Sequence, residues 1–310
     1  MSRGILVIGA TFVDIKGYPD GLYIPGGRNA GRVIQTHGGV CRNIAEDIGN
    51  VELRPSFVSV VDESGTSTDV LAKLARHRVN TDFVRRTPDG LGTWLAIFDS
   101  TGDVVASISK RPDLMPILEI LEEHGDELFS SADSIVVEID IDTPILKKVL
   151  ELAQRYGKKV YSPVTNMSIA MERRDLLKYI SCVVCNCQEA GLLFSEVYKE
   201  EAGPALQPVI AEKVRLAQLQ KMVVTLGGNG AVYADSTGES GYVPAMKVEC
   251  VDTTGCGDAF FAGVAIGLTY GKTLREACSI GTRLASAVIA TKESVCPRFL
   301  PEEFGLESRA

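Results

Sequence analysis

The sequence predicts an α/β protein: a three-layer α/β/α arrangement with a central, mainly parallel sheet. Short apolar runs of strand length alternate along the chain with amphipathic segments of helix length. Strands of a parallel sheet are buried on both faces, so they take the form of short continuous apolar runs. No internal repeat or low-complexity linker interrupts the pattern. We therefore expect residues 1–310 to form a single domain.

The elements follow one another in an order that supports this class. The apolar run 5–8 lacks the length and cleavage site of a signal peptide and is interpreted as a buried strand. Ile44 and Ile48 lie four residues apart with Cys41 one turn earlier, which is the period of a helix. The expected elements are strand 4–9, helix 39–48, strand 56–61, helix 66–76, strand 134–139, helix 144–155, and strands 159–162, 182–185 and 221–226.

One region departs from the alternation. Residues 93–98 and 104–108 are apolar and flank a polar segment with a glycine, which predicts a hairpin. The segment 17–35 is rich in glycine and proline and shows little helical pattern. Together they predict a small β-flap formed by about 15–36 and 92–110. Trp94 and Tyr23 are either contacts of this flap or simple packing residues.

Composition limits the classes of partner. The chain has 45% hydrophobic and 23% charged residues, the usual range for a globular protein. A formal net charge of −8 argues against a nucleic-acid polymer as partner, because no basic stripe offsets it. The chain has no apolar stretch of about 18 residues or more, so we expect no membrane span and a soluble, cytoplasmic protein.

The eight cysteines are scattered and are expected to be reduced thiols. Cys182, Cys185 and Cys187 suggest a metal site by their spacing, but no second pair or nearby histidine completes it. The competing interpretation is a buried strand, 180–187, that happens to contain cysteines. We favour the strand.

The segment 251–260 carries the most information about function. Gly255 and Gly257 precede an apolar helix-like run, 259–268. A glycine loop that opens onto a helix N-terminus presents main-chain N–H groups to an anion. Asp258 lies beside that anion site, where a carboxylate is unfavourable unless it accepts a proton from a hydroxyl that attacks a phosphate. The alternative is an ordinary strand–loop–helix turn.

The whole segment resembles the second signature of the ribokinase-like (PfkB-type) carbohydrate kinases. The matching residues are Asp252, Thr254, Gly255, Gly257 and Asp258, and Cys256 stands where the family usually has alanine. The resemblance implies an ATP-dependent kinase that phosphorylates a hydroxyl of a sugar or nucleoside. Asp258 would be the general base, and the N–H groups of Gly255, Cys256 and Gly257 would stabilise the developing charge. The β-flap would be the family's lid over the sugar.

Further motifs occur in the family's order. Gly38 and Gly39 followed by Asn43 resemble the first signature, which contacts sugar hydroxyls. Asn186 and Glu189 resemble the Asn-x-x-Glu motif, in which Glu189 would organise Mg²⁺ through water. A helix N-terminal capping box is the alternative. The segment 225–230 resembles the nucleotide loop, with expected contacts from Thr225, Gly227, Gly228 and Gly230.

The resemblance also assigns two substrate-side carboxylates and a cation site. Asp14 and Glu138 follow strands and would bind sugar hydroxyls, or else be surface or capping acids. Asp252 and Thr254 resemble positions that help to hold a monovalent cation, usually K⁺. The segment 287–294 would supply the remaining ligands of that ion and part of the adenine wall.

Substrate identity stays open among pseudouridine, another nucleoside or ribose-type sugar, and a different substrate. The segments 14–17, 29–33 and 38–46 resemble the pseudouridine kinase branch, from which the chain departs at Lys110-Arg111 and Glu138. A non-catalytic sugar- or nucleotide-binding sensor on the same fold is the alternative function. A dinucleotide-binding oxidoreductase is disfavoured, because G-x-G-x-x-G does not follow Gly9. Homodimerisation through the lid is a further expectation from the resemblance.

Overall fold

The computed structural model describes residues 4–100, 103–164 and 166–307, and its core is a twisted sheet of nine strands. The strand order is β13-β12-β11-β10-β9-β8-β1-β4-β5. All neighbours are parallel except the pairs made by β12 with β11 and β13. The bounds are β1 Ile5–Ile8, β4 Ser56–Val61, β5 Asn80–Arg86, β8 Ser134–Val137, β9 Val160–Pro163, β10 Cys182–Asn186, β11 Lys221–Thr225, β12 Ala231–Asp235 and β13 Ser240–Val243. The predicted α/β class with a mainly parallel central sheet is confirmed.

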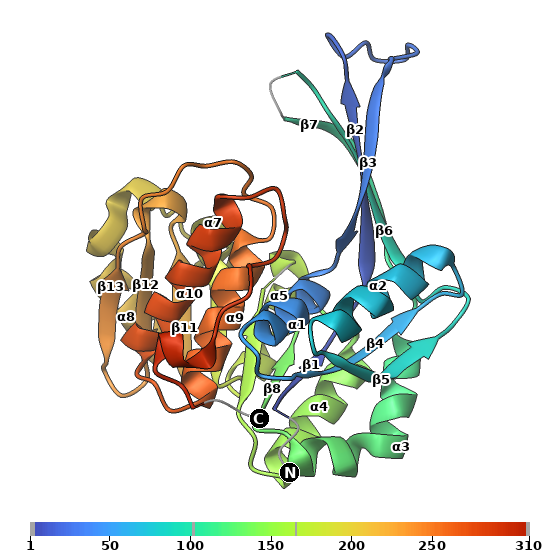
Figure 1. Cartoon of the computed structure of the whole chain (residues 1–310). Helices are drawn as coiled ribbons and strands as arrows, with labels where there is room; N and C mark the ends of the chain where they lie inside the picture. Colours follow the sequence, from blue (N-terminus) through green and yellow to red (C-terminus); the bar gives the residue numbers. More distant parts are fainter. Residues whose placement is uncertain (1–3, 101–102, 165, 308–310) are drawn as a thin grey trace.

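Helices cover both faces of this sheet (Figure 1). Alternate residues of each strand enter different apolar layers: Leu6 and Ile8 join one, and Ile5 and Val7 the other. The first layer packs against α3 Met115–Ser131, α4 Thr143–Arg155, α6 Arg174–Leu177, α7 Cys187–Phe194 and α8 Leu206–Leu216. The second packs against α1 Val40–Asn50, α2 Gly65–Arg76, α9 Cys256–Thr269 and α10 Leu274–Ile289. The short α5, Met167–Glu172, follows β9.

A separate sheet of four strands projects from the main body (Figure 1). Its order is β3-β2-β6-β7, with β2 Phe12–Pro19, β3 Gly31–Gly38, β6 Gly92–Phe98 and β7 Val104–Lys110. The predicted hairpin is therefore β6–β7, although residues 101 and 102 of its turn lie outside the described residues. The segment 17–35 adds the second pair of strands. We call this sheet the lid sheet.

The cysteine-containing strand needs a correction. It ends at Asn186, and Cys187 begins helix α7 instead of continuing the strand to 187. Cys182 and Cys185 enter opposite apolar layers of the sheet. The two thiols therefore pack on different faces. Burial raises the pKa of each.

Two further comparisons with the sequence predictions concern the end of one strand and membrane-spanning helices. The strand predicted over 134–139 ends at Val137, and the last two residues form the turn that carries Glu138. Along the described ranges, no helix is long and apolar enough to cross a membrane.

Candidate active site

The glycine loop before α9 has the backbone that the sequence suggested. Gly255 caps the helix with φ 80°, a conformation that side chains other than glycine rarely adopt. A Cβ at this position would lie 1.9 Å from the carbonyl oxygen of Ser294. The loop is thus packed tightly against the segment that follows α10. Apart from its chain neighbours and the backbone of its own helix, no described heavy atom lies within 4 Å of a Cβ built at Gly257, so that side of the loop is open to a ligand.

Asp258 occupies the first turn of α9, directly after the loop. Burial raises the pKa of its carboxyl to about 7, and a hydrogen bond from Asn43 acts in the opposite direction. The Nδ2 atom of Asn43 donates this bond to Oδ2 of Asp258 over 2.7 Å. Asn43 reaches it from the first turn of α1, whose N-cap is Gly39. Asp258 can therefore exchange a proton near neutral pH.

A polar cavity of about 580 Å³ opens in front of Asp258. Seven predicted residues line it: Asp14, Gly39, Asn43, Glu138, Thr254, Gly255 and Asp258. They come from the lid sheet, the start of α1, the turn after β8, and the glycine loop with the first turn of α9, which are far apart in the sequence. We call this hollow the polar cavity. Its array of carboxylate and amide groups can bind several hydroxyl groups of a small molecule.

Three carboxylates line the polar cavity besides Asp258: the predicted Asp14 and Glu138, and Asp140. Asp14 lies on β2, next to Gly38. A Cβ added to Gly38 would lie 2.5 Å from the Oδ1 atom of Asp14. Burial raises the pKa of Asp14, and the nearby Lys16 lowers it. Glu138 accepts a 3.2 Å hydrogen bond from the main-chain N–H of Cys41, and burial and Asp140 raise its pKa to about 7. Desolvated carboxyl groups of this kind favour partners that donate hydrogen bonds.

The sequence patterns did not identify Lys16 as part of the site. This side chain is only 8% exposed, and its Nζ atom lies 3.4 Å from Oγ1 of Thr254 in the glycine loop. It follows Asp14 by two residues on β2, so both point from the same face of the lid sheet. A buried ammonium group beside an anion-binding loop adds positive charge where a phosphoryl group would lie.

Other residues of the polar cavity were missed or left undecided. Trp94 pairs with Asp14 across β2 and β6 and lines the cavity, whereas Tyr23 lines a different hollow on the lid sheet. Arg111 also lines the cavity, and its Nη2 atom donates a 2.7 Å hydrogen bond to the carbonyl oxygen of Asp140. The remaining lining residues are Ala10, Phe12, Val40, Ser109, Leu114, Asp140 and Asn166.

A less polar groove of about 300 Å³ lies on the other side of the glycine loop. Four of the predicted nucleotide-loop residues line it together with two of the glycine loop: Thr225, Gly227, Gly228, Gly230, Cys256 and Gly257. Its other walls come from the segment 245–250 and from α10, which includes Ile289 of the predicted adenine wall. We call it the apolar groove. A flat aromatic base fits a groove walled by glycine and apolar side chains.

Asn186 and Glu189 lie in a third hollow, of about 270 Å³, with Thr225, Gly257 and Asp258. They form a capping box at the start of α7: Asn186 Oδ1 accepts from Glu189 N over 2.8 Å, and Asn186 N donates to Glu189 Oε2 over 2.7 Å. The capping alternative is therefore present. It does not exclude a second role, because Glu189 is half-buried in the same hollow as Asp258. Burial raises the pKa of Glu189.

The predicted cation residues lie behind the glycine loop. Asp252 Oδ1 accepts a 2.8 Å hydrogen bond from the N–H of Thr254, and Asp252 N lies 3.3 Å from the carbonyl oxygen of Ile289. Carboxylate and carbonyl oxygens of this kind are suitable ligands for a hard cation. Their proximity fits the expected participation of the segment 287–294, which includes the end of α10.

The three hollows meet at Gly257 and Asp258, since Asp258 lines two of them and Gly257 two. A titratable carboxylate between a hydroxyl-binding cavity and a base-sized groove, at an anion-binding loop, is the arrangement of a small-molecule kinase. The family comparison agrees: residues 2–297 match the pfkB family carbohydrate kinase model. The chain belongs to this family, and it is a carbohydrate or nucleoside kinase.

Relatives of several substrate classes resemble the chain. It is 31% identical to the guanosine-inosine kinase of Exiguobacterium acetylicum, over 94% of this chain and 95% of the relative. It is 27% identical to the pseudouridine kinase of Escherichia coli (strain K12), over 89% and 88%. The structure of Arabidopsis thaliana ribokinase complexed with ribose and ATP matches with a TM-score of 0.83 at 20% identity, over 98% and 99%. This last match confirms the ribokinase-like fold.

Proposed function

We propose that the protein transfers the γ-phosphoryl group of ATP to a hydroxyl of a nucleoside bound in the polar cavity. The observation that carries this proposal is the position of Asp258. Its carboxyl, with a pKa of about 7, lies between the polar cavity and the glycine loop. A substrate hydroxyl in the cavity can give its proton to Asp258 as its oxygen attacks phosphorus.

The surrounding residues would orient the base and stabilise the developing negative charge. Asn43 donates to Oδ2 of Asp258 and holds the carboxylate in one orientation. Main-chain N–H groups of the glycine loop and the N-terminus of α9 stabilise negative charge that develops on the transferred group. Lys16 reaches the glycine loop from the lid sheet and adds a positive charge beside Thr254. Asp14 and Glu138 bind substrate hydroxyls.

The same geometry supports a proposal for where ATP and its metal ions bind. Adenine would occupy the apolar groove, with the phosphates at Gly257. When bound, Mg²⁺ neutralises phosphate charge; Glu189 would hold it through water from the third hollow. Asp252 and Thr254 would help to hold a K⁺ ion behind the glycine loop.

A purine with O6 and N7 acceptors is our first choice of base. Guanosine and inosine both present these two acceptors on one edge, and arginine can donate to both. Arg111 lines the polar cavity with such donors, and Trp94 and Phe12 offer aromatic surface for stacking. The similarity to the guanosine-inosine kinase supports the same choice.

Pseudouridine is the second candidate. The glycine–glycine–valine–x–arginine–asparagine pattern of residues 38–43 and the 27% identity to a pseudouridine kinase favour it. Ribose and a non-catalytic sensor are further alternatives, and the intact loop with Asp258 argues against the sensor.

The lid sheet has two chemically different faces. Asp14, Trp94 and Ser109 are neighbours across β2, β6 and β7 and line the polar cavity, so this face would close over the substrate. The next row, Ile15, Leu95 and Ile108, points the other way, and Ile108 is 70% exposed. A second copy of the chain would cover this apolar face in a symmetric dimer. Sedimentation with Ile108→Lys tests it, and a wild-type monomer would contradict the dimer.

An ATP-consumption screen tests the proposed reaction. Guanosine, inosine, adenosine, pseudouridine and ribose are compared with Mg²⁺, with and without K⁺, and the product is identified by phosphorus NMR. We expect guanosine and inosine to be phosphorylated and adenosine to be a poor substrate. Arg111→Met should remove that preference while leaving Asp258-dependent turnover measurable. Equal activity with adenosine would contradict the role of Arg111, and no phosphorylated product with any acceptor would favour the sensor.

A further inference from the structure

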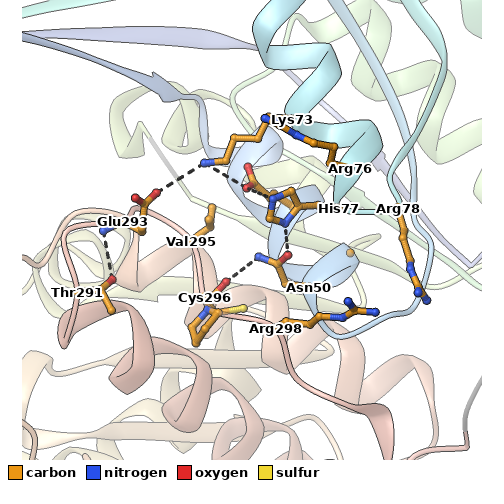
Figure 2. A pocket seen from close by; sticks show the side chains of 13 residues that line it. Asn50, Lys73, Arg76, His77, Arg78, Thr291, Glu293, Val295, Cys296 and Arg298 are labelled. Carbon is orange, nitrogen blue, oxygen red and sulfur yellow. Dashed lines mark hydrogen bonds and ion pairs between the residues drawn. The ribbon is translucent and has the colours of Figure 1, made fainter.

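Another cavity, of about 410 Å³, lies apart from the polar cavity at Asp258. Figure 2 shows the side chains that line it. It is formed between the C-terminal end of α2 and the segment 291–298, over α1. We call it the basic cavity, because four arginine or lysine side chains line it against two glutamates. Its lining residues are Glu46, Gly49, Asn50, Lys73, Arg76, His77, Arg78, Thr291, Glu293, Val295, Cys296, Pro297 and Arg298.

Two of the four cationic side chains are Lys73 and Arg76, and His77 lies beside them; burial lowers the pKa of His77. Lys73 and Arg76 lie in the last turn of α2 and His77 is its C-cap, a spacing that places them on neighbouring positions of the helix surface. Within the described part of the chain, Arg76 makes no ion pair. Arg78 and Arg298 lie to one side, and both pair with Glu52. The charge of Arg76 is therefore available to an anion, whereas Lys73 already pairs with Glu46 and Glu293 and would share its charge with the anion.

The cavity also offers a buried acceptor. Glu46 is fully buried, and Arg42 forms an ion pair with its Oε2 atom. Its Oε1 atom lies 3.3 Å from Nζ of Lys73 and 3.7 Å from Nε2 of His77, yet no hydrogen bond satisfies it. A buried carboxylate oxygen without a hydrogen bond is costly, and a ligand that donates one would remove the cost.

Two connections lead from the basic cavity to the catalytic loop. Arg42, which pairs with Glu46, donates a 2.7 Å hydrogen bond from Nη1 to Oδ1 of Asn43. Asn43 in turn donates to Asp258. The second connection is covalent: Glu293 lines the basic cavity, and the next residue, Ser294, packs its carbonyl oxygen against Gly255. The basic cavity is thus connected by contacts to the base and by the chain to the glycine loop.

We propose that the basic cavity is an effector site for a phosphate monoester that carries hydroxyl groups, such as a sugar or nucleoside phosphate. Lys73 and Arg76 would bind the phosphate. A hydroxyl of the ligand would donate to Oε1 of Glu46. Inorganic phosphate shares the first interaction and lacks the second, and its small volume leaves most of the cavity unfilled. Nothing in this assignment depends on which nucleoside the active site phosphorylates.

Calorimetric titration tests binding. Ribose 5-phosphate and inorganic phosphate are titrated into the wild type, Asp14→Ala, Arg76→Gln and Lys73→Gln, with Arg215→Gln as a matched control on exposed α8. We expect the ester to bind more tightly than phosphate, and Arg76→Gln to weaken it by roughly tenfold or more, the value of one charge-assisted interaction. Asp14→Ala and Arg215→Gln should leave it unchanged.

A second variant makes the prediction more specific. Glu293 pairs with Lys73 over 3.7 Å and is 71% exposed at the cavity wall, so Glu293→Gln should strengthen ester binding by removing a competing charge. Loss of binding in Asp14→Ala, together with unchanged binding in Arg76→Gln, would place the ester in the active site and overturn the proposal. Equal affinity for inorganic phosphate and ester would overturn the role of Glu46.

Measurements of kcat test the effector role. Turnover is measured at saturating substrate and ATP, where competition at the active site no longer affects the rate. Ribose 5-phosphate should change kcat by roughly twofold or more in the wild type, and not in Arg76→Gln, a size typical of weak coupling between sites. An unchanged kcat in the wild type, with calorimetric binding present, would overturn the effector role.

Discussion

The amide of Asn43 donates a 2.7 Å hydrogen bond to the carboxylate of Asp258, and these two residues lie 215 positions apart in the sequence. The bond joins the first turn of α1 to the first turn of α9. Burial raises the pKa of Asp258, whereas the amide donor stabilises the charged form. The balance, a pKa of about 7, suits a base that must accept a proton and later release it near neutral pH.

Replacement of the base is the first prediction. Asp258→Asn keeps the shape of the side chain but cannot accept a proton, so kcat should fall by about 10²–10⁴-fold. Affinity for ATP, measured by calorimetry, should change little, because the apolar groove does not include Asp258. Turnover close to that of the wild type would mean that another group is the base.

The same variant gives a prediction about stability. The native carboxyl holds its proton up to a pKa of about 7, above the usual value of 3.8. Between these values the folded protein binds more protons than the unfolded chain, so Asp258 makes the unfolding free energy fall as pH rises from about 4 to 7. Asp258→Asn removes this loss, and its melting temperature should exceed that of the wild type at pH 8.

The advantage of Asp258→Asn should shrink as pH falls towards 4, because the folded carboxyl is then protonated and the unfolded one begins to be protonated near its usual pKa of 3.8. Asp82→Asn, at an exposed position on β5, is the control and should show no such pH-dependent gain. A melting-temperature difference that stays constant from pH 4 to 8 would contradict the raised pKa.

Glu189 allows the metal role and the capping role to be separated. Glutamine can replace glutamate in a capping box, so Glu189→Gln should keep the start of α7 and the melting temperature. It loses the charge that would attract hydrated Mg²⁺, so the Mg²⁺ concentration for half-maximal activity should rise and kcat should fall. An unchanged Mg²⁺ activation curve would leave capping as the role of Glu189.

The sequence predicted those parts of the site that are local in the chain. The glycine loop, Asp258 and the Asn186–Glu189 pair each lie within a few residues, and their spacing alone identifies a turn followed by a helix. Asn43 was found by the same kind of local motif. That Asn43 contacts Asp258 is a tertiary fact, which no spacing along the chain contains.

The missed parts have physical reasons. Lys16 is a single lysine in a strand, a residue that is usually exposed, and only the packing of the lid sheet buries it. Strand β5 has charged and half-exposed residues at the edge of the sheet, so it lacks the apolar run that marks an interior strand. Helix α3, by contrast, has buried residues 117, 120, 121 and 128 at helical spacing, a signal that the sequence does contain.

Lys16 leads to a prediction about phosphate charge. Lys16→Met keeps the buried stem and removes the ammonium group beside Thr254. We expect kcat to fall by roughly ten- to a hundredfold, the value of a hydrogen bond to a charged group, and Lys16→Arg to recover part of it. Lys110→Met, on the same sheet but exposed and paired with Asp89, is the matched control. A similar loss in both variants would indicate a general effect on the lid sheet.

The last prediction concerns closure of the lid sheet. Asp14 lies on β2, within the sheet, and also lines the polar cavity, so a substrate hydroxyl bound by it would tie the lid sheet to the body. Binding of the accepted nucleoside should slow amide hydrogen exchange in residues 12–38 and 92–110 more than ATP alone does, because ATP offers no hydroxyl at Asp14. Asp14→Ala should raise the KM for the nucleoside and abolish this protection. Asp20→Ala, at the exposed end of the same strand pair, should behave as the wild type. Equal exchange with and without nucleoside would mean that the lid sheet is static. The role left for the lid sheet would then be to contact a second copy of the chain through its apolar outer face.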